Sequence, residues 1–139
     1  TALGAAEVLD RNSIQRGTRP LEKPTWAGAV DSLGGDWLAW LTRTMKIHGT
    51  IASIGLTAGH EMHTTVMPFI LRGVALLGVD SSNTQMPLRQ KIWDRLATDL
   101  KPRHLAGLAH TIEFAQLPET FPRFIESKVS GRTVVRIAG

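Results

Sequence analysis

The chain has no cysteine, which excludes disulfides and any metal site built on thiolates within it, and a reducing compartment such as the cytoplasm is the expected location. It also has no long apolar segment. The longest one, from Thr65 to Leu77, is interrupted by a proline, an arginine and a glycine, and it is shorter than the ~20 residues that a membrane span needs. The first residues lack the basic start and apolar run of a signal peptide. We therefore expect no membrane partner, and the missing initiating methionine indicates an internal start.

The composition is that of a globular protein, with 42% hydrophobic and 20% charged residues among 139. The formal charge of +4 comes from the second part of the chain: residues 1–80 hold seven basic and seven acidic side chains, and residues 81–139 hold nine and five. A nucleic-acid-binding domain would need this surplus to form a patch. Arg89, Lys91 and Arg95 are instead interspersed with aspartates, as on a solvated helix face. We expect no nucleic-acid partner, whereas a small polyanion would suit the surplus.

Short apolar runs, bounded by glycine, proline or polar residues, recur along the first part of the chain and predict buried strands. Between the second and third run, apolar residues recur at helical spacing, and Gly49 is expected to end that helix. This alternation is typical of a parallel sheet with crossover helices. The expected strands are 7–9, 27–31, 50–54 and 74–79, and the expected helices are 35–46 and 64–71.

The pattern changes after Asp80, where a polar, turn-rich segment precedes a helix that carries Leu88, Ile92, Leu96 and Leu100 on one face. This change indicates a second structural unit. The end of the chain predicts a strand over 110–114, a helix over 117–128 and a strand over 133–137, with a turn at glycine 131.

The spacing becomes specific in the run DSLGG, from Asp31 to Gly35, which is followed by glycines at 49 and 55. This pattern resembles the second half of the nucleotide-binding domain of medium-chain dehydrogenases and reductases. Four further segments, RPLEKPTWAGAVD, TTVMPFILRG, LLGVDS and GRTVVRI, resemble the zinc-independent branch of acrylyl-CoA reductases and quinone oxidoreductases. The resemblance covers essentially the whole chain and looks like a carboxyl-terminal fragment of that family.

The fold that the resemblance implies is α/β: an incomplete doubly wound (Rossmann) parallel sheet that lacks its first two strands, plus the carboxyl-terminal tail of the substrate domain. Residues 1–82 would be the second half of the dinucleotide-binding domain, and residues 83–139 the returning tail. The strand order of such a sheet is 3-2-1-4-5-6, so the absent strands, with the glycine-rich phosphate turn, belong to its middle. We expect residues 1–15 to be displaced, disordered or paired with another molecule, while the next three strands stay together.

The resemblance implies NADPH as the cofactor, bound at the carboxyl ends of the strands. Gly55 would let the backbone approach it, Leu56 would offer an apolar surface, Ile70 would close the pocket, and Ser81 would hydrogen-bond a carboxamide or ribose. From the pattern alone the alternative is structural, with Leu56 and Ile70 in the core, Gly55 in a turn and Ser81 as a cap.

Two arginines are further cofactor candidates. Arg11 resembles the position near the adenine, where a guanidinium can stack on the ring and attract phosphate. Arg132 could approach a cofactor phosphate, and the alternative is a solvated arginine in a tight turn. No metal site is expected, because His60 and His63 lack the i, i+4 spacing of helical zinc ligands. No nucleophilic triad is identifiable, and no catalytic residue is assigned, since the proton donors of the family come mainly from the absent part.

The leading hypothesis is a parent enzyme that transfers hydride from NADPH to an activated carbon–carbon double bond, in an acrylyl thioester or a quinone-like enone. The fragment alone is expected to be inactive. An alternative is a self-associating structural fragment without cofactor binding, and a third is a basic nucleic-acid-binding domain, which would associate with DNA in a salt-dependent way. We expect a homodimer through the strand Val74–Val79, or higher self-association through the unpaired edge beside 27–31.

Overall fold

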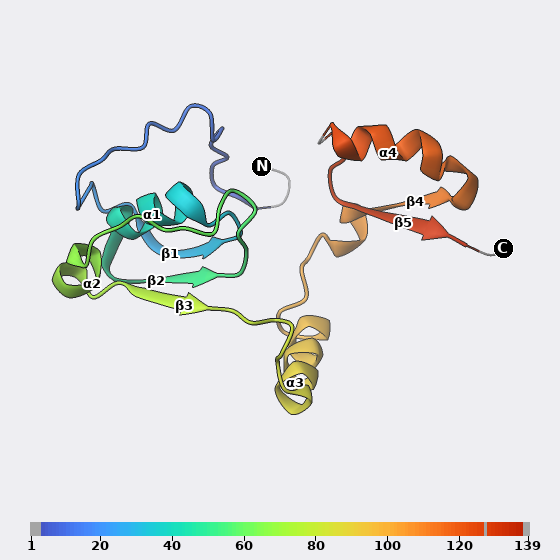
Figure 1. The fold of residues 1–139 in the computed structure, drawn as a ribbon. Helices are drawn as coiled ribbons and strands as arrows, with labels where there is room; N and C mark the ends of the chain where they lie inside the picture. The colour runs from blue at the N-terminus through green and yellow to red at the C-terminus, as the bar shows by residue number, and fades with distance from the viewer. Residues whose placement is uncertain (1–3, 127, 138–139) are drawn as a thin grey trace. The chain divides into compact units, whose positions relative to one another are not determined.

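A computed structural model describes residues 4–126 and 128–137 of the chain (Figure 1). The chain forms two compact units. One unit holds Ala6–Gln85, and the other holds the described residues from Met86 onward together with Gly4 and Ala5.

The first unit is a three-stranded parallel sheet with its strands in the order β1-β2-β3. The strands are β1 (Trp26–Asp31), β2 (Met45–Ser53) and β3 (Ala75–Gly78), and the connecting helices are α1 (Gly35–Thr44) and α2 (Met67–Arg72). The expected α/β class with a parallel sheet is confirmed. The three strands that were expected to remain together do so, in the order of the chain.

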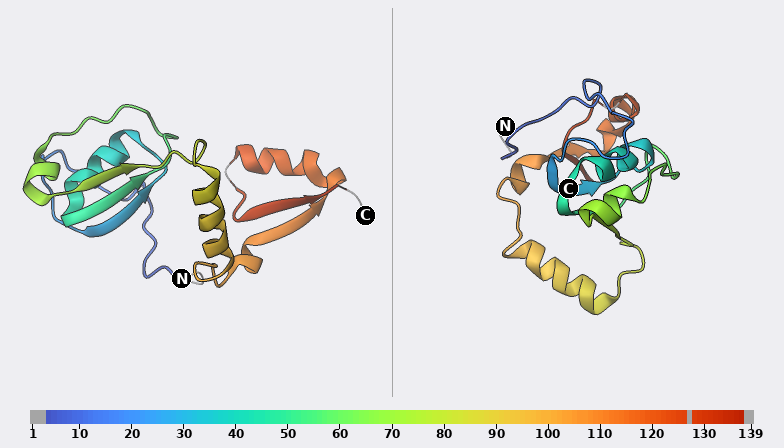
Figure 2. Two further views of the ribbon diagram at one scale, coloured as in Figure 1. Left: turned by 90° about the horizontal axis from the view of Figure 1, so that it is seen from below. Right: turned by 90° about the vertical axis from the view of Figure 1, so that its left-hand side faces the viewer.

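The core of this unit lies between the sheet and α1. Leu38 of α1 packs with Met45 and Ile51 of β2, and all three are buried. On the opposite face, Val30 of β1 and Leu77 of β3 are 78% and 54% exposed, and both pair in register with the same residue of β2. Figure 2 shows α1 over one face of the sheet. The sheet therefore presents an uncovered apolar face, whereas parallel sheets are usually buried on both faces.

The strand expected over residues 7–9 is wrong. No helix or strand forms between residues 4 and 25, and Val8 and Leu9 are 73% and 45% exposed. A three-residue apolar run forms a strand only where a neighbouring strand supplies backbone partners, and the described sheet offers none beside it. Residues 4–15 form no helix or strand, and residues 1–3 lie outside the described part, so the displacement expected for residues 1–15 stays a prediction.

The boundary between α1 and β2 also differs from the prediction. The helix ends at Thr44, and the backbone of Met45 is already extended. Gly49 does not end the helix but lies inside β2. The reason is tertiary, because the fully buried Met45 side chain fixes the start of β2 against the core. Further on, α2 starts at Met67 instead of residue 64 and ends before Gly73, which has a left-handed φ of 59°.

The second unit contains one helix followed by a strand, helix, strand motif. Its elements are α3 (Met86–Ala97), β4 (Ala109–Glu113), α4 (Leu117–Ile125) and β5 (Arg132–Arg136), with short 3-10 turns at Leu105–Leu108 and Phe114–Gln116. Strands β4 and β5 are parallel neighbours, and α4 is three residues shorter than predicted. Among residues 86–126 and 128–137, no side chain is buried. A two-stranded unit without a core is only marginally stable by itself.

Candidate functional site

The turn after β1 is organised by the carboxylate of Asp31, which is 3% exposed. It accepts hydrogen bonds from the backbone N–H groups of Leu33 (3.2 Å) and Gly34 (3.1 Å) and from the hydroxyl of Ser53 (3.3 Å). Gly34 has a φ of 68°, a conformation that favours glycine, and it precedes the first residue of α1. The Asp-Ser-Leu-Gly-Gly run is thus the sharp turn from strand to helix.

The loop after β2 lies directly against this turn. Ala58 donates its N–H to the carbonyl of Leu33 (2.8 Å), and Thr57 donates its hydroxyl to the carbonyl of Ser32 (3.1 Å). Gly55 approaches so closely that a Cβ added to it would lie 2.5 Å from the Ser32 carbonyl oxygen. Position 55 is therefore a glycine because the loop after β2 contacts the turn after β1 at this point, at the carboxyl end of the sheet.

The turn after β3 is built on Asp80. Its carboxylate accepts from the side-chain amide of Asn83 (2.7 Å) and from the backbone N–H groups of Asn83 (3.0 Å) and Ser82 (3.1 Å). These bonds, that of the Asn83 side chain first, lower the pKa of Asp80 below its ordinary value. The carboxylate is therefore ionised at neutral pH, and it brings negative charge to this end of the sheet.

An open depression of about 430 Å³ lies between the ends of β2 and β3. It is bounded by a short stretch of each strand's carboxyl end, and its lining residues are Ser53, Ile54, Gly55, Leu56, Gly78, Val79 and Asp80. Apolar side chains and glycine backbone dominate this lining, and no Lys, Arg or His belongs to it. Such a surface suits a flat, weakly polar ring better than a phosphate group.

The depression brings together some of the residues predicted from the sequence. Gly55 and Leu56 line it, with Leu56 64% exposed, and Ser81 follows the lining residue Asp80 in the chain. Ile70 is 71% exposed and lies in α2, near the end of the sheet where the strands begin (Figure 1). It does not belong to the lining.

The two arginine candidates also lie outside the lining of the depression. Arg11 is exposed in a turn of the segment that precedes β1. Arg132 is the first residue of β5, in the second unit, and is exposed. Sequence reasoning missed Asp31 as an organising residue. An aspartate that ends an apolar strand just before a Leu-Gly-Gly turn was the available signal, because aspartate side chains bond backbone N–H groups two or three residues on.

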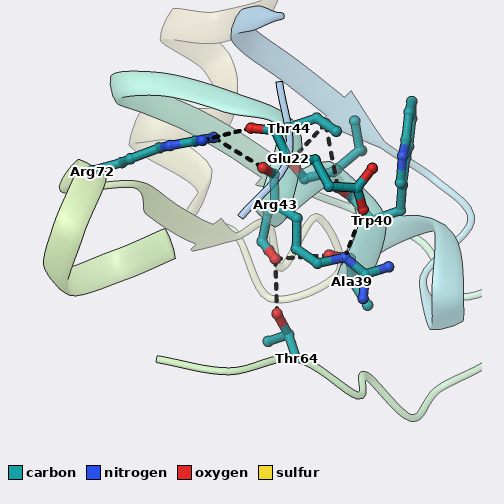
Figure 3. Close-up of polar contacts among 9 residues, drawn as sticks. Glu22, Ala39, Trp40, Arg43, Thr44, Thr64 and Arg72 are labelled. Atoms are coloured by element: carbon teal, nitrogen blue, oxygen red, sulfur yellow. Dashed lines mark hydrogen bonds and ion pairs between the residues drawn. The ribbon is translucent and has the colours of Figure 1, made fainter. Parts of the chain in front are cut away.

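At the opposite end of the first unit, Arg72 joins three segments (Figure 3). The guanidinium donates to the carbonyls of Arg43 and Met45, at 2.9 Å each, and to the carbonyl of Glu22. Glu22 in turn donates its N–H to Arg43 and pairs with the Arg43 side chain at 3.4 Å. No local pattern indicated this role, because the three acceptors are backbone groups that only the fold brings together.

In the described part of the chain, no three His, Asp or Glu side chains are grouped so that they could hold a metal ion. The exposed His63 lies 3.7 Å from Glu61. Likewise, none of the helices in residues 4–126 and 128–137 is long and apolar enough to cross a membrane.

Parallel strands joined by helices, with glycine turns and a depression at their carboxyl ends, define the class of open α/β proteins, in which ligands bind at that end of the sheet. Comparison with known proteins agrees with this class. The chain is 39% identical to the protein named "Putative quinone oxidoreductase YhfP" of Bacillus subtilis (strain 168), over 97% of the chain. It is 38% identical to "Acrylyl-CoA reductase AcuI" of Ruegeria pomeroyi, over 99% of the chain. No family model matches the chain.

Solved structures give the same result. The crystal structure of B. subtilis YhfP with NAD bound superposes with a TM-score of 0.87 at 39% identity, covering 98% of the chain. That of the YhdH oxidoreductase of Salmonella enterica in complex with NADP superposes with a TM-score of 0.86 at 42% identity, covering 99%. The chain belongs to the medium-chain dehydrogenase/reductase family, in the branch of acrylyl-CoA reductases and quinone oxidoreductases. It spans 42% of the length of each of these relatives.

Proposed function

We propose that the chain is part of an NADPH-dependent reductase that acts on the activated carbon–carbon double bond of an acrylyl thioester or a quinone-like enone. The names of the relatives support the reaction class, and a relative 42% identical holds NADP in its crystal structure. When bound, the cofactor supplies the hydride. A cytoplasmic location is part of this proposal, because reduced nicotinamide cofactors are supplied by metabolism inside the cell.

The observation that carries the proposal is the depression between β2 and β3. Its lining fits the nicotinamide end of such a cofactor, because Gly55 has no side chain that would keep a ligand from the backbone, and Leu56 offers an apolar surface. Ser81, just beyond the lining, is our candidate partner for a carboxamide or ribose hydroxyl. Arg11 and Arg132 remain proposed cofactor contacts, and Ile70 remains one outside this depression, to whose lining it does not belong.

The proposed division of labour follows the two units. Residues 1–82 would form the second half of the dinucleotide-binding domain, and residues 83–139 the tail of the substrate domain. The lining of the depression supplies no cation for a pyrophosphate. The chain by itself would therefore hold the nicotinamide end of NADPH weakly, and we assign it no catalytic residue.

A titration of the chain with NADPH, monitored by two-dimensional amide NMR spectra, tests this proposal. We expect shifts centred on the amides of Gly55, Leu56 and Gly78, with weak affinity, and no NADPH oxidation with an acrylyl thioester or a quinone. Adenosine 2′,5′-bisphosphate, which lacks the nicotinamide, serves as the control and should leave these amides unchanged. The absence of shifts at these amides at millimolar NADPH would favour the alternative, a self-associating structural fragment, and turnover by the chain alone would contradict the expected inactivity.

We also propose that the chain self-associates, either as a homodimer through β3 or through the free edge of β1. Edge strands commonly carry a proline or a charged residue that prevents pairing with another chain. Neither β1 nor β3 carries such a residue, apart from Asp31 at the end of β1. Val30 and Leu77 add an exposed apolar face.

Sedimentation velocity over a range of concentrations checks the proposed self-association. We expect a species larger than 15.2 kDa, and a shift toward the monomer when the exposed Leu77 of β3 or the exposed Val30 of β1 is replaced by lysine. The variant that shifts further toward the monomer identifies the strand, β1 or β3, through which the chain self-associates. A monomer at all concentrations would contradict self-association, and His60→Lys, in a loop outside the sheet, is the matched control.

A further inference from the structure

The carboxylate of Asp31 is buried, and its hydrogen-bond partners in the described residues are neutral: two backbone N–H groups and the hydroxyl of Ser53. A buried charge is unfavourable unless donors surround it. Here the donors lie immediately before the first turn of α1, where the helix dipole also favours negative charge. The surrounding donors and the helix dipole thus favour the negative charge of the Asp31 side chain.

The turn held by Asp31 determines where the next loop lies. The N–H groups of Leu33 and Gly34 fold back onto the carboxylate, and this leaves the carbonyls of Ser32 and Leu33 directed at the loop after β2. Those carbonyls accept from Thr57 and Ala58. The backbone carbonyl of Asp31 accepts from Ile54 at 2.8 Å, just before Gly55.

The bond from Ser53 adds a direct link to the depression. Ser53 is one of the lining residues, and its hydroxyl donates to Asp31. Asp31 itself does not belong to the lining. Any effect of its carboxylate on a ligand in the depression must therefore pass through Ser53, or through the turn at 32–34 and the loop at 54–58.

We propose that Asp31 is a positioning residue that holds the backbone of Gly55 and Leu56 in the geometry that the nicotinamide end of the cofactor requires. The proposal rests on the proposed function for its ligand, but its structural part stands independently. The carboxylate contributes by accepting from three groups at once, the N–H groups of Leu33 and Gly34 and the hydroxyl of Ser53, at 3.1–3.3 Å. An amide at this position would lose one acceptor oxygen and, in either orientation, direct its NH2 group at the N–H of Gly34.

The test compares Asp31→Asn, Asp31→Ala and the control Asp36→Asn, which removes an exposed carboxylate in the first turn of α1. Amide hydrogen exchange is measured by NMR at Gly34 and Ala58, which report the turn and the loop, and at Ile51 and Leu76, which report the paired strands. We expect exchange at Gly34 and Ala58 to accelerate tenfold or more in Asp31→Ala and less in Asp31→Asn, which keeps one acceptor. Ile51, Leu76 and the control should stay within twofold of the original chain.

The same variants are then titrated with NADPH. We expect the affinity reported by Gly55 and Leu56 to fall at least tenfold in Asp31→Ala, with partial recovery in Asp31→Asn. Equal acceleration of exchange throughout the sheet would show a role in global stability only and would overturn the proposal, as would unchanged exchange at Gly34 and Ala58. If the original chain gives no NADPH shifts, the proposed function fails, while the exchange pattern still decides whether Asp31 positions the two loops.

Discussion

Replacement of Arg72 by methionine is expected to lower the free energy of unfolding of the first unit by about 2–4 kcal/mol, since charged hydrogen bonds contribute about 1.5–3 kcal/mol and the loss of a donor to partly buried carbonyls adds a cost. Arg72 donates to the carbonyl of Glu22, before β1, and to the carbonyls of Arg43 and Met45, at the junction of α1 and β2. Methionine keeps most of the length and apolar character of the side chain. The loss would therefore come from the missing donors.

Urea unfolding followed by tryptophan fluorescence measures this loss, because Trp26, Trp37 and Trp40 all belong to the first unit. Arg72→Lys should be intermediate, because an ammonium group lacks the planar fork that reaches several carbonyls at once. The exposed Arg19 supplies the control, and Arg19→Met should change stability by less than about 0.5 kcal/mol. A value for Arg72→Met indistinguishable from that of this control would contradict the role assigned to the three hydrogen bonds.

Gly55→Ala is expected to lower the free energy of unfolding by about 1–3 kcal/mol, the usual cost of forcing an extra carbon into a packed site. The added Cβ would lie 2.5 Å from the carbonyl oxygen of Ser32, and this oxygen is a backbone atom, so one of the two loops must move. Because Gly55 also lines the depression, the same change should weaken the NADPH-induced shifts at Leu56.

Gly78→Ala is the matched control for this substitution. Gly78 lines the same depression, but a Cβ there meets no atom within 4 Å. We expect its stability to stay equal or to rise by about 0.4–1 kcal/mol, because alanine reduces the conformational freedom of the unfolded chain. Equal losses of stability in the two variants, measured by urea unfolding, would contradict the close approach of the loops at Gly55.

Much of the fold follows from local sequence patterns. The apolar runs at Ala27–Asp31 and Val74–Val79 and the helical spacing after Gly35 correctly indicated β1, β3 and α1. The prediction failed at residues 7–9, where the apolar residues have no neighbouring strand in the described sheet and are exposed. It also failed at Met45, which starts β2 because its side chain is buried in the core. In both cases the outcome depends on contacts between segments distant in sequence.

The candidate site divides in the same way. Glycine-rich turns after two strands, together with the resemblance to a reductase family, were sufficient to select Gly55, Leu56 and Ser81 for one end of the sheet. The roles of Asp31 and Arg72 could not be derived from the sequence. Their partners are mostly backbone groups, and residue type carries no information about which backbone groups the fold brings near.

By itself, the sequence determined the α/β class and the parallel strands, because apolar periodicity and turn residues are local properties of the chain, and its motifs indicated the family by resemblance. Tertiary structure alone decided which loops touch at the carboxyl end of the sheet, and that Gly55 must be a glycine. The physical reason is that the hydrogen bonds from Thr57 to Ser32 and from Ala58 to Leu33, and the close approach of Gly55 to Ser32, exist only after β1 and β2 have paired in register.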